Sequence, residues 1–261
     1  MTRAINCAGL LYISFCFTSN VLSLFDAPPF LAPLSFLLPL LLFLTPAFRK
    51  CEKQELDFNF KVALPFLPMF FVFLSCIFIT SVASSVAFSV IGYESKPVTP
   101  EPDAVSAVIF SIIIPSVCEE LFCRYATLRL LAPYGKSGAV VLSALLFALL
   151  HRNFYQMPYA FVAGLFLGAV TLASGGIACA IIFHMLNNGL STILYYSSDK
   201  INAAVYITFL ICAILYAATC SHSSAPARIL SLRDASVKPM LLRSCFSLVA
   251  LFALYALLVS I

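Results

Sequence analysis

The sequence predicts an all-α protein that crosses a membrane many times. Of its 261 residues, 62% are hydrophobic and only 10% are charged, and the mean hydropathy is +1.03. A soluble domain is about 25% charged, so this composition excludes a soluble globular protein. Apolar runs close to the ~20 residues that cross a bilayer recur along the chain, without the alternating strands of an outer-membrane barrel. We expect a polytopic transmembrane helical bundle of about eight or nine helices, forming one membrane domain over residues 1–261.

Apolar segments bounded by charged residues, Pro or Gly are the predicted membrane helices. The first is expected to be retained rather than removed as a signal peptide, because no clean cleavage site follows and Asp26-Ala27-Pro28-Pro29 predicts a turn. In order, the segments are residues 5–25, 30–48, 70–91, 104–131, 138–151, 159–173, 177–196, 203–219 and 241–261. The motif-bearing core is expected at about residues 104–197.

The distribution of basic residues predicts the orientation. With the N-terminus in the cytoplasm, Arg3 and the stretches 49–61, 124–136 and 228–243 lie on the cytoplasmic side. Lys96, Arg152 and Lys200 are then the basic residues on the opposite side, as the positive-inside rule predicts. The formal charge of +4 comes from short clusters rather than from a broad basic stripe, so we expect the lipid bilayer and no nucleic acid as a partner.

One predicted membrane helix carries a dense cluster of charges, Glu119, Glu120 and Arg124. An ionisable residue at membrane depth costs about 2.5–3.5 kcal/mol and is a functional candidate by default. Glu120 and Arg124 are four residues apart and can form an ion pair across one turn, in a structural or site-shaping role. Glu119 is turned by about 100° from Glu120 and needs another partner.

Two other predicted helices supply polar side chains. His151 ends the segment 138–151, and His184 and Asn188 share one face of the segment 177–196. At a rise of ~1.5 Å per residue, these side chains and Glu119 lie roughly 14 to 23 Å from one membrane surface, which is compatible with a shared cavity. The third histidine, His222, is expected in a solvated loop.

These residue types are suited to peptide hydrolysis by an activated water. Desolvation disfavours the charged form of a carboxylate, so Glu119 in an apolar cavity is the candidate general base. His151 is the candidate for carrying the proton to the leaving amine. His184 and Asn188 offer N–H donors to the oxyanion of a tetrahedral intermediate.

Two alternatives stay open. Zn²⁺ held by two His and one Glu would also activate a water, although HExxH is absent and the ligands would come from three separate helices. We therefore favour a mechanism with no cofactor and no bound metal. A non-catalytic membrane protein, such as a proton-coupled transporter, could use the same polar cluster, although the chain shows no internal repeat of the kind transporters carry.

The three motifs together resemble one family. In chain order they are EExxxR (Glu119, Glu120, Arg124), FxxxH (Phe147, His151) and HxxxN (His184, Asn188). This order on successive apolar helices resembles the CPBP intramembrane proteases, also called the CAAX protease or ABI family. That family includes the type II CAAX prenyl endopeptidases and bacterial relatives linked to bacteriocin processing or self-immunity.

The resemblance implies a glutamate-dependent intramembrane endopeptidase. It assigns water activation to Glu119 with His151 as its partner, the oxyanion side to His184 and Asn188, and packing to Phe147. The implied substrate is a membrane-anchored protein or peptide, cleaved in a cavity that we expect to open to the cytoplasm. A prenylated protein is the natural substrate in a eukaryotic endomembrane, and a peptide precursor or membrane protein in a bacterium. The compact chain with short loops favours a bacterial inner membrane over the endoplasmic reticulum membrane. An immunity-type scaffold that binds its target without cleaving it belongs with the non-catalytic alternatives.

Overall fold

The fold is a bundle of helices. The computed structural model describes residues 1–93, 103–220 and 223–260. Within these ranges the chain has no β-strand, and an isolated bridge joins the extended backbone at Asp57 to Gly176. The predicted all-α class is therefore confirmed. Lys96 and His222 lie outside the described residues, so the predictions made for them have no structural counterpart here.

Six helices in the described part of the chain are long and apolar enough to cross a membrane. They are α1 (Thr2–Leu24), η3 with α4 (Phe60–Met69 and Phe70–Val90), the continuous helix Ala104–Tyr134, α9 (Met157–Ser174), α10 (Ala178–Tyr195) and α11 (Asp199–Thr219). The pair α13 (Val237–Ser244) and α14 (Leu248–Ser260) is bent by 75° and would make a seventh span. The remaining helix of the C-terminal region is α12 (Ser224–Leu230). The chain is thus an integral multi-pass membrane protein.

Two of the nine predicted spans are shorter than a full span. The segment 138–151 forms α8 (Lys136–Leu150), and the segment 30–48 forms a broken apolar stretch, Pro29–Leu44, followed by a short helix. The pieces of this second segment are η1 (Pro29–Leu31), α2 (Leu34–Leu37), η2 (Leu38–Leu44) and α3 (Pro46–Arg49). Prolines recur along it, and each one removes a backbone N–H donor and disfavours a continuous α-helix. The expected eight or nine spans therefore become six or seven full-length ones.

The continuous helix Ala104–Tyr134 carries the EExxxR motif and contains two π-helical stretches. Its parts are α5 (Ala104–Ser106), η4 (Ala107–Ile113), α6 (Ile114–Glu120), η5 (Leu121–Leu128), α7 (Arg129–Leu131) and η6 (Ala132–Tyr134). The stretches η4 and η5 are π-helical, and Pro115 lies just after the first of them. Pro115 has no N–H to donate to the preceding turn, and π-helical turns are common at functional sites. The two glutamates thus lie in the short α-helical piece between two wide turns.

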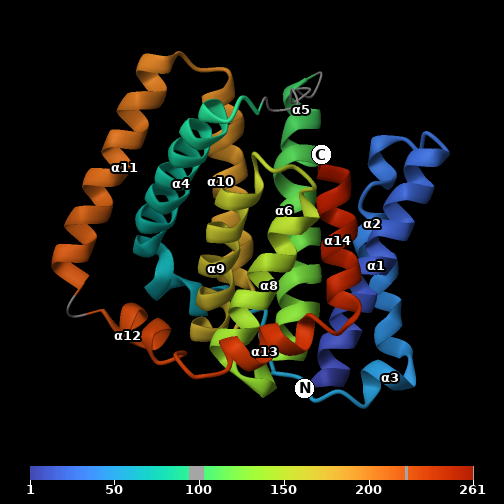
Figure 1. The fold of residues 1–261 in the computed structure, drawn as a ribbon. Helices are drawn as coiled ribbons and strands as arrows, with labels where there is room; N and C mark the ends of the chain where they lie inside the picture. Colours follow the sequence, from blue (N-terminus) through green and yellow to red (C-terminus); the bar gives the residue numbers. More distant parts are fainter. Residues whose placement is uncertain (94–102, 221–222, 261) are drawn as a thin grey trace.

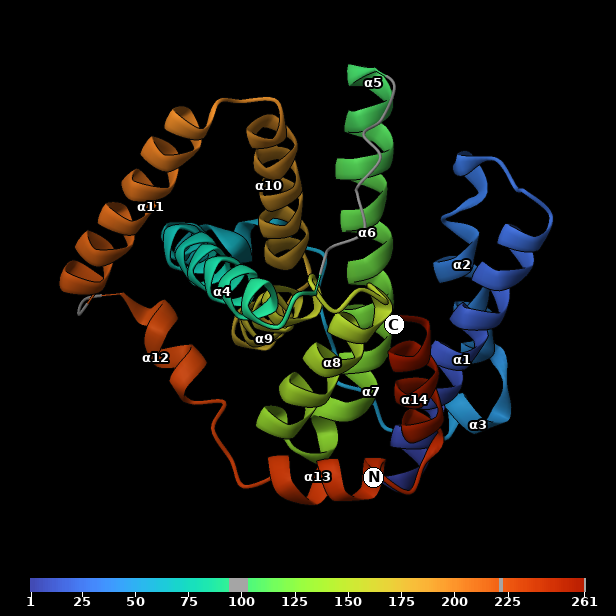
Figure 2. The same ribbon diagram turned by 45° about the horizontal axis from the view of Figure 1, so that its top comes forward.

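Figures 1 and 2 show how these helices are arranged. The C-terminal helix α14 packs against α1, far from it in sequence, and Tyr12 of α1 contacts the Phe252 ring with centroids 4.8 Å apart. On the other side of α6 lie α9, α10 and α4, and α11 packs outside them against α4. The N-terminus, α3, α12 and α13 lie at one end of the bundle, and the α10–α11 turn and α5 lie at the other.

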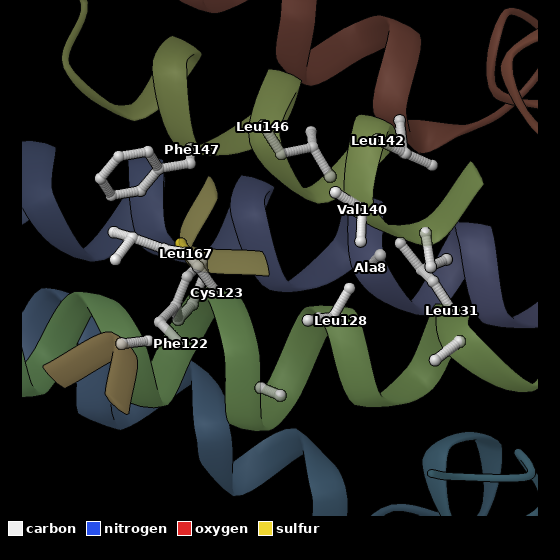
Figure 3. Close-up of a cluster of buried hydrophobic side chains, with 14 of the residues drawn as sticks. Ala8, Phe122, Cys123, Leu128, Leu131, Val140, Leu142, Leu146, Phe147 and Leu167 are labelled. Carbon is white, nitrogen blue, oxygen red and sulfur yellow. The ribbon is translucent and has the colours of Figure 1, made fainter. Parts of the chain in front are cut away.

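The core lies where α8 crosses η5. Figure 3 shows Val140 and Leu146 of α8 on the side of the motif-bearing helix that carries Phe122 and Leu128, and Leu142 on the side of the C-terminal helices. These side chains are at most 7% exposed. By contrast, α11 buries only Ala213 among its residues, so most of its apolar surface is available to lipid. The site described below is therefore held by the well-packed centre of the bundle.

Candidate active site

The polar centre of the bundle is an ion pair between Glu120 and Arg124, as their spacing predicted. Arg124 Nη1 donates to Glu120 Oε1 at 3.0 Å, and both side chains are 0% exposed. The same Oε1 atom lies 2.9 Å from Nδ1 of His184. Because an ionised carboxylate only accepts hydrogen bonds, Nδ1 of His184 carries a proton in this contact. Glu120 therefore connects the motif-bearing helix to α10 and fixes the tautomer of His184.

Two further contacts hold the guanidinium of Arg124. Nη2 donates to the backbone carbonyl of Gly164 on α9 at 3.3 Å, and the guanidinium carbon lies 4.5 Å from the ring centroid of Phe147 on α8. The Phe147 ring also packs edge to face against His151 at 5.1 Å and His184 at 5.8 Å between ring centroids. A cation over an aromatic face is attracted by the negative charge density of that face. Phe147 thus contacts Arg124 and both histidines.

Glu119 lies beside His184 on the opposite side of the imidazole from Glu120. Its Oε2 atom is 3.9 Å from Nε2 of His184, and its side chain is 17% exposed. This oxygen is buried and makes no hydrogen bond with any described residue. In the neutral ring Nδ1 holds the proton and Nε2 is an acceptor, so the two facing atoms are both acceptors. Such a pair can share the two hydrogens of one water molecule.

His151 is placed by the end of α8. Its Nδ1 atom is 3.0 Å from the carbonyl oxygen of Phe147, one turn earlier in the same helix. The carbonyl can only accept, so Nδ1–H is the donor and Nε2 is left as an acceptor in the neutral ring. Both His151 and His184 were candidate partners for Glu119, and the resemblance implied His151. The structure places Glu119 next to His184 and records no direct contact between Glu119 and His151.

Both histidines line one cavity of about 220 Å³, which we call the inner cavity. Asn188 lines it too, and its Nδ2 atom donates to Ser116 Oγ at 3.4 Å. The full lining is Phe73, Ile77, Phe147, His151, Gln156, Tyr159, Ala160, Ala163, Leu167, His184, Asn187, Asn188 and Ser191. The structure thus brings His151, His184 and Asn188 to one enclosed space, with Glu119 adjoining it through His184.

A second space, the outer cavity, adjoins the inner one and has a volume of about 300 Å³. The two share five lining residues, Ile77, Gln156, Tyr159, Asn187 and Ser191. The remaining residues of the outer cavity are Leu74, Phe78, Ser81, Asn153, Tyr155, Leu190, Leu194 and Tyr206. Residues 153–156 belong to the loop between α8 and α9, which carries no motif. Sequence reasoning therefore missed this part of the site.

The next feature is the set of side chains that could bind a metal ion. Within residues 1–93, 103–220 and 223–260, no three His, Cys, Asp or Glu side chains gather closely enough to hold an ion. The metal-independent mechanism and the expectation of no cofactor stay predictions.

The fold and these buried groups show what class of protein this is. It is an intramembrane protein in which carboxylate and imidazole groups are paired beside a cavity. Residues 101–190 match the sequence model of one family, described as type II CAAX prenyl endopeptidase Rce1-like. This segment carries all three motifs, so over residues 101–190 the chain is similar to the CAAX protease (CPBP) family. Comparison with curated proteins and with solved structures found no match.

Proposed function

We propose that this protein is an endopeptidase that cleaves a membrane-anchored protein or peptide with a water held between Glu119 and His184. The observation that carries the proposal is the pair of acceptors Glu119 Oε2 and His184 Nε2, 3.9 Å apart. A water bound there donates one hydrogen to each and keeps a lone pair for attack on a carbonyl carbon.

Each polar residue has a separate task in this proposal. Glu119 takes the proton of the water as its oxygen attacks the scissile carbonyl. Glu120 holds the proton on Nδ1 of His184, so that Nε2 stays an acceptor. His151 lines the same cavity with Nε2 free to accept. In the proposal the proton taken by Glu119 moves through water in the inner cavity to Nε2 of His151, which then gives it to the leaving nitrogen as the C–N bond breaks. Asn188 donates from Nδ2 to the oxyanion.

This assignment differs in one respect from the sequence expectation. His184 was expected to donate to the oxyanion together with Asn188. With Nδ1 committed to Glu120, the neutral imidazole has no second N–H, and Nε2 can donate only when the ring is cationic. We therefore assign the oxyanion to Asn188 and give His184 to the water.

The membrane and the substrate follow from the family and the chain together. A membrane-embedded protease acts on a substrate that reaches it within or beside the bilayer. We propose that the protein lies in a bacterial inner membrane and that its substrate is a peptide precursor or a membrane protein. In a eukaryotic endomembrane the corresponding substrate class would be prenylated proteins.

The test compares membrane-protein termini in matched cells that lack the native protein and express wild type, Glu119→Gln or Glu55→Gln. Glu119→Gln keeps the side chain's shape but is a poor base, whereas Glu55 is exposed and lines neither cavity, so its variant is the matched control. We expect new termini in wild type and Glu55→Gln that are absent in Glu119→Gln. Folded yield of each variant is measured by gel filtration in detergent.

Two outcomes would count against the proposal. Termini that persist in a folded Glu119→Gln variant would remove Glu119 as the base. A phenotype rescued by wild type but not by Glu119→Gln, without any change in termini, would favour the transporter or immunity-type scaffold.

A further inference from the structure

The outer cavity has a chemistry of its own. Its polar lining consists of neutral groups, the amides of Asn153, Gln156 and Asn187 together with serine and tyrosine hydroxyls. None of the described residues that line either cavity is Lys, Arg, Asp or Glu. An amide side chain offers both N–H donors and a carbonyl acceptor, which are the groups that a peptide unit needs as partners.

The amides nearest the catalytic cluster are held in place and have free atoms. Gln156 occupies the N-cap position of α9, and its carbonyl accepts from the Ala160 N–H at 3.0 Å. The side chain of Gln156 makes no hydrogen bond with any described residue, and it lines both cavities. Asn187 also lines both, and its Nδ2 atom donates to Asn188 Oδ1 at 3.3 Å while its own carbonyl oxygen has no partner among the described residues.

The lining from α4 is mainly apolar. It consists of Leu74, Ile77 and Phe78 together with Ser81, and the ring of Phe78 stacks on Tyr206 of α11 with centroids 3.9 Å apart. A hydrocarbon tail in this space would leave the amides of Gln156 and Asn187 without partners, at a cost in free energy. A peptide in extended conformation can place its main chain on the amide side and apolar side chains on α4.

From this arrangement we propose that the outer cavity is the binding site for the substrate's main chain beside the scissile bond, and that it selects an uncharged extended segment. The inference rests on the proposed function, because the segment continues from a bond cleaved in the inner cavity. Gln156 and Asn187 are its specificity-determining residues, through hydrogen bonds to the peptide N–H and C=O groups. A charged side chain or a free terminal carboxylate at this position would be desolvated without a counter-charge from any described residue of the lining.

The experiment uses the full-length protein in proteoliposomes and a library of lipid-anchored decapeptides, supplied with either a free carboxylate or an amide at the C-terminus. Cleavage is read by mass spectrometry for wild type, Gln156→Leu and Gln156→Glu. Gln54→Leu, which alters a glutamine outside both cavities, is the matched control, and Glu119→Gln defines the background.

We expect wild type to cleave uncharged sequences in the interior of the peptides and to ignore the state of the C-terminus. Gln156→Leu should raise KM about 5- to 10-fold with kcat little changed, since it removes one or two neutral hydrogen bonds. Gln156→Glu should shift cleavage toward peptides with Lys or Arg next to the scissile bond. Gln54→Leu should match wild type.

The failures are distinguishable. A library that wild type leaves intact overturns the proposed function, and this inference falls with it. A second outcome is cleavage that depends on Glu119 while Gln156→Leu leaves KM unchanged and Gln156→Glu shows no charge preference. That result supports the peptidase but overturns the main-chain site. Glu119-dependent cleavage that requires a free terminal carboxylate also overturns the inference.

Discussion

Two adjacent glutamates have different environments, and their environments separate their roles. Glu120 is fully buried, and its Oε1 atom accepts from both Arg124 and His184, although its Oε2 atom makes no hydrogen bond with any described residue. Glu119 keeps an oxygen without a hydrogen bond beside the free face of the same imidazole. The paired carboxylate is suited to positioning His184, and the other to proton transfer.

Truncating the arginine should therefore damage folding first. Arg124→Ala leaves the charge of Glu120 in a dry site, and breaking a buried pair from one side costs about 3–5 kcal/mol. We expect a lower folded yield and a lower unfolding temperature in detergent. The double variant Glu120→Gln/Arg124→Met removes both charges at similar volume and should recover much of that loss.

The same double variant separates stability from positioning. Once Glu120 is replaced by Gln, the amide no longer forces the proton onto Nδ1 of His184. We expect a folded protein with reduced cleavage. A double variant as active as wild type would show that the tautomer of His184 does not depend on Glu120.

The sequence indicates which residues are candidates for the site, but it does not show which of them contact one another. The i, i+4 spacing of Glu120 and Arg124 is enough to predict their ion pair. It does not reveal that His184 lies between both glutamates, because that depends on how α10 is rotated and tilted against α6. Gln156 and Asn187 belong to no recognisable motif, so their place in the cavities comes from the three-dimensional arrangement alone.

At the scale of elements, α8 and α9 approach most closely at a glycine. A Cβ atom on Gly164 would lie 2.8 Å from the Ala144 Cα atom, whereas one on Gly168 would meet Val140 at an ordinary 3.5 Å. Both glycines belong to the small-residue pattern of α9, and the pattern alone does not distinguish them.

The two glycines should consequently respond differently to the same substitution. Gly164→Ala is expected to destabilise the protein by about 1–3 kcal/mol, because it forces apart two backbones that also hold Arg124 through the Gly164 carbonyl. Gly168→Ala should be neutral or slightly stabilising, since Ala has the higher helix propensity. Thermal unfolding in detergent measures both, and equal effects would contradict the close contact.

A second element-scale feature is the cap of α8, supplied by a distant part of the chain. The N-cap residue Gly135 has no side chain, and Asp234 Oδ2 accepts instead from the Lys136 N–H at 2.7 Å. Ser236 Oγ accepts from the Gly138 N–H at 2.8 Å, and the hydroxyls of Ser137 and Ser236 also donate to Asp234. The loop before α13 is thereby tied to the start of the helix that carries His151.

Removing this cap should weaken the fold by a modest amount. Asp234→Ala leaves the first N–H of α8 without its acceptor, and losing an N-cap costs about 0.5–2 kcal/mol. Asp234→Asn keeps an acceptor oxygen and should lose less. A thermal unfolding series of the two variants against wild type checks the order, and an Ala variant as stable as wild type would contradict the capping role.

The charge of Asp234 gives this cap a pH dependence. Partial burial disfavours the charge, but hydrogen bonds from Ser137, Ser236 and the Lys136 backbone outweigh it and hold the pKa of Asp234 well below its ordinary value of 3.8. A carboxyl group with a lowered pKa stabilises the folded state above the unfolded pKa, and that contribution disappears as pH falls through the folded pKa. The stability difference between wild type and Asp234→Asn should be constant near neutral pH and shrink below about pH 4.

Helix boundaries show where sequence reasoning was limited. Apolar length located every long helix of the bundle, because burial in lipid demands it. The second segment is not a continuous span because its prolines break it, and the segment 138–151 forms a helix shorter than a full span. The last segment is part of the pair α13 and α14, between which the chain turns by 75°. Apolar composition predicts that such a segment is buried, but it does not predict whether the helix is continuous.

At the scale of the whole molecule, two expectations from the sequence conflict. The positive-inside rule places the basic end, with α12, α13 and the N-terminus, in the cytoplasm. The cavity was also expected to open to the cytoplasm. However, α8 starts at the basic end, where Lys136 binds Asp234, and the loop that follows α8 supplies Asn153, Tyr155 and Gln156 to the outer cavity. An N-in orientation therefore directs that loop to the opposite side.

Labelling with a membrane-impermeant maleimide distinguishes the two orientations. Lys238 on α13 and Lys200 at the start of α11 are both exposed and lie at opposite ends of the bundle, so Lys238→Cys and Lys200→Cys are matched reporters, with wild type as the control for native thiols. In intact cells we expect labelling of Lys200→Cys, and labelling of Lys238→Cys only after permeabilisation. Under that result the loop of the outer cavity faces away from the cytoplasm, and the substrate's uncharged segment must be presented from that side. The reverse labelling pattern would overturn the N-in orientation and return the loop, with the cavity, to the cytoplasmic side.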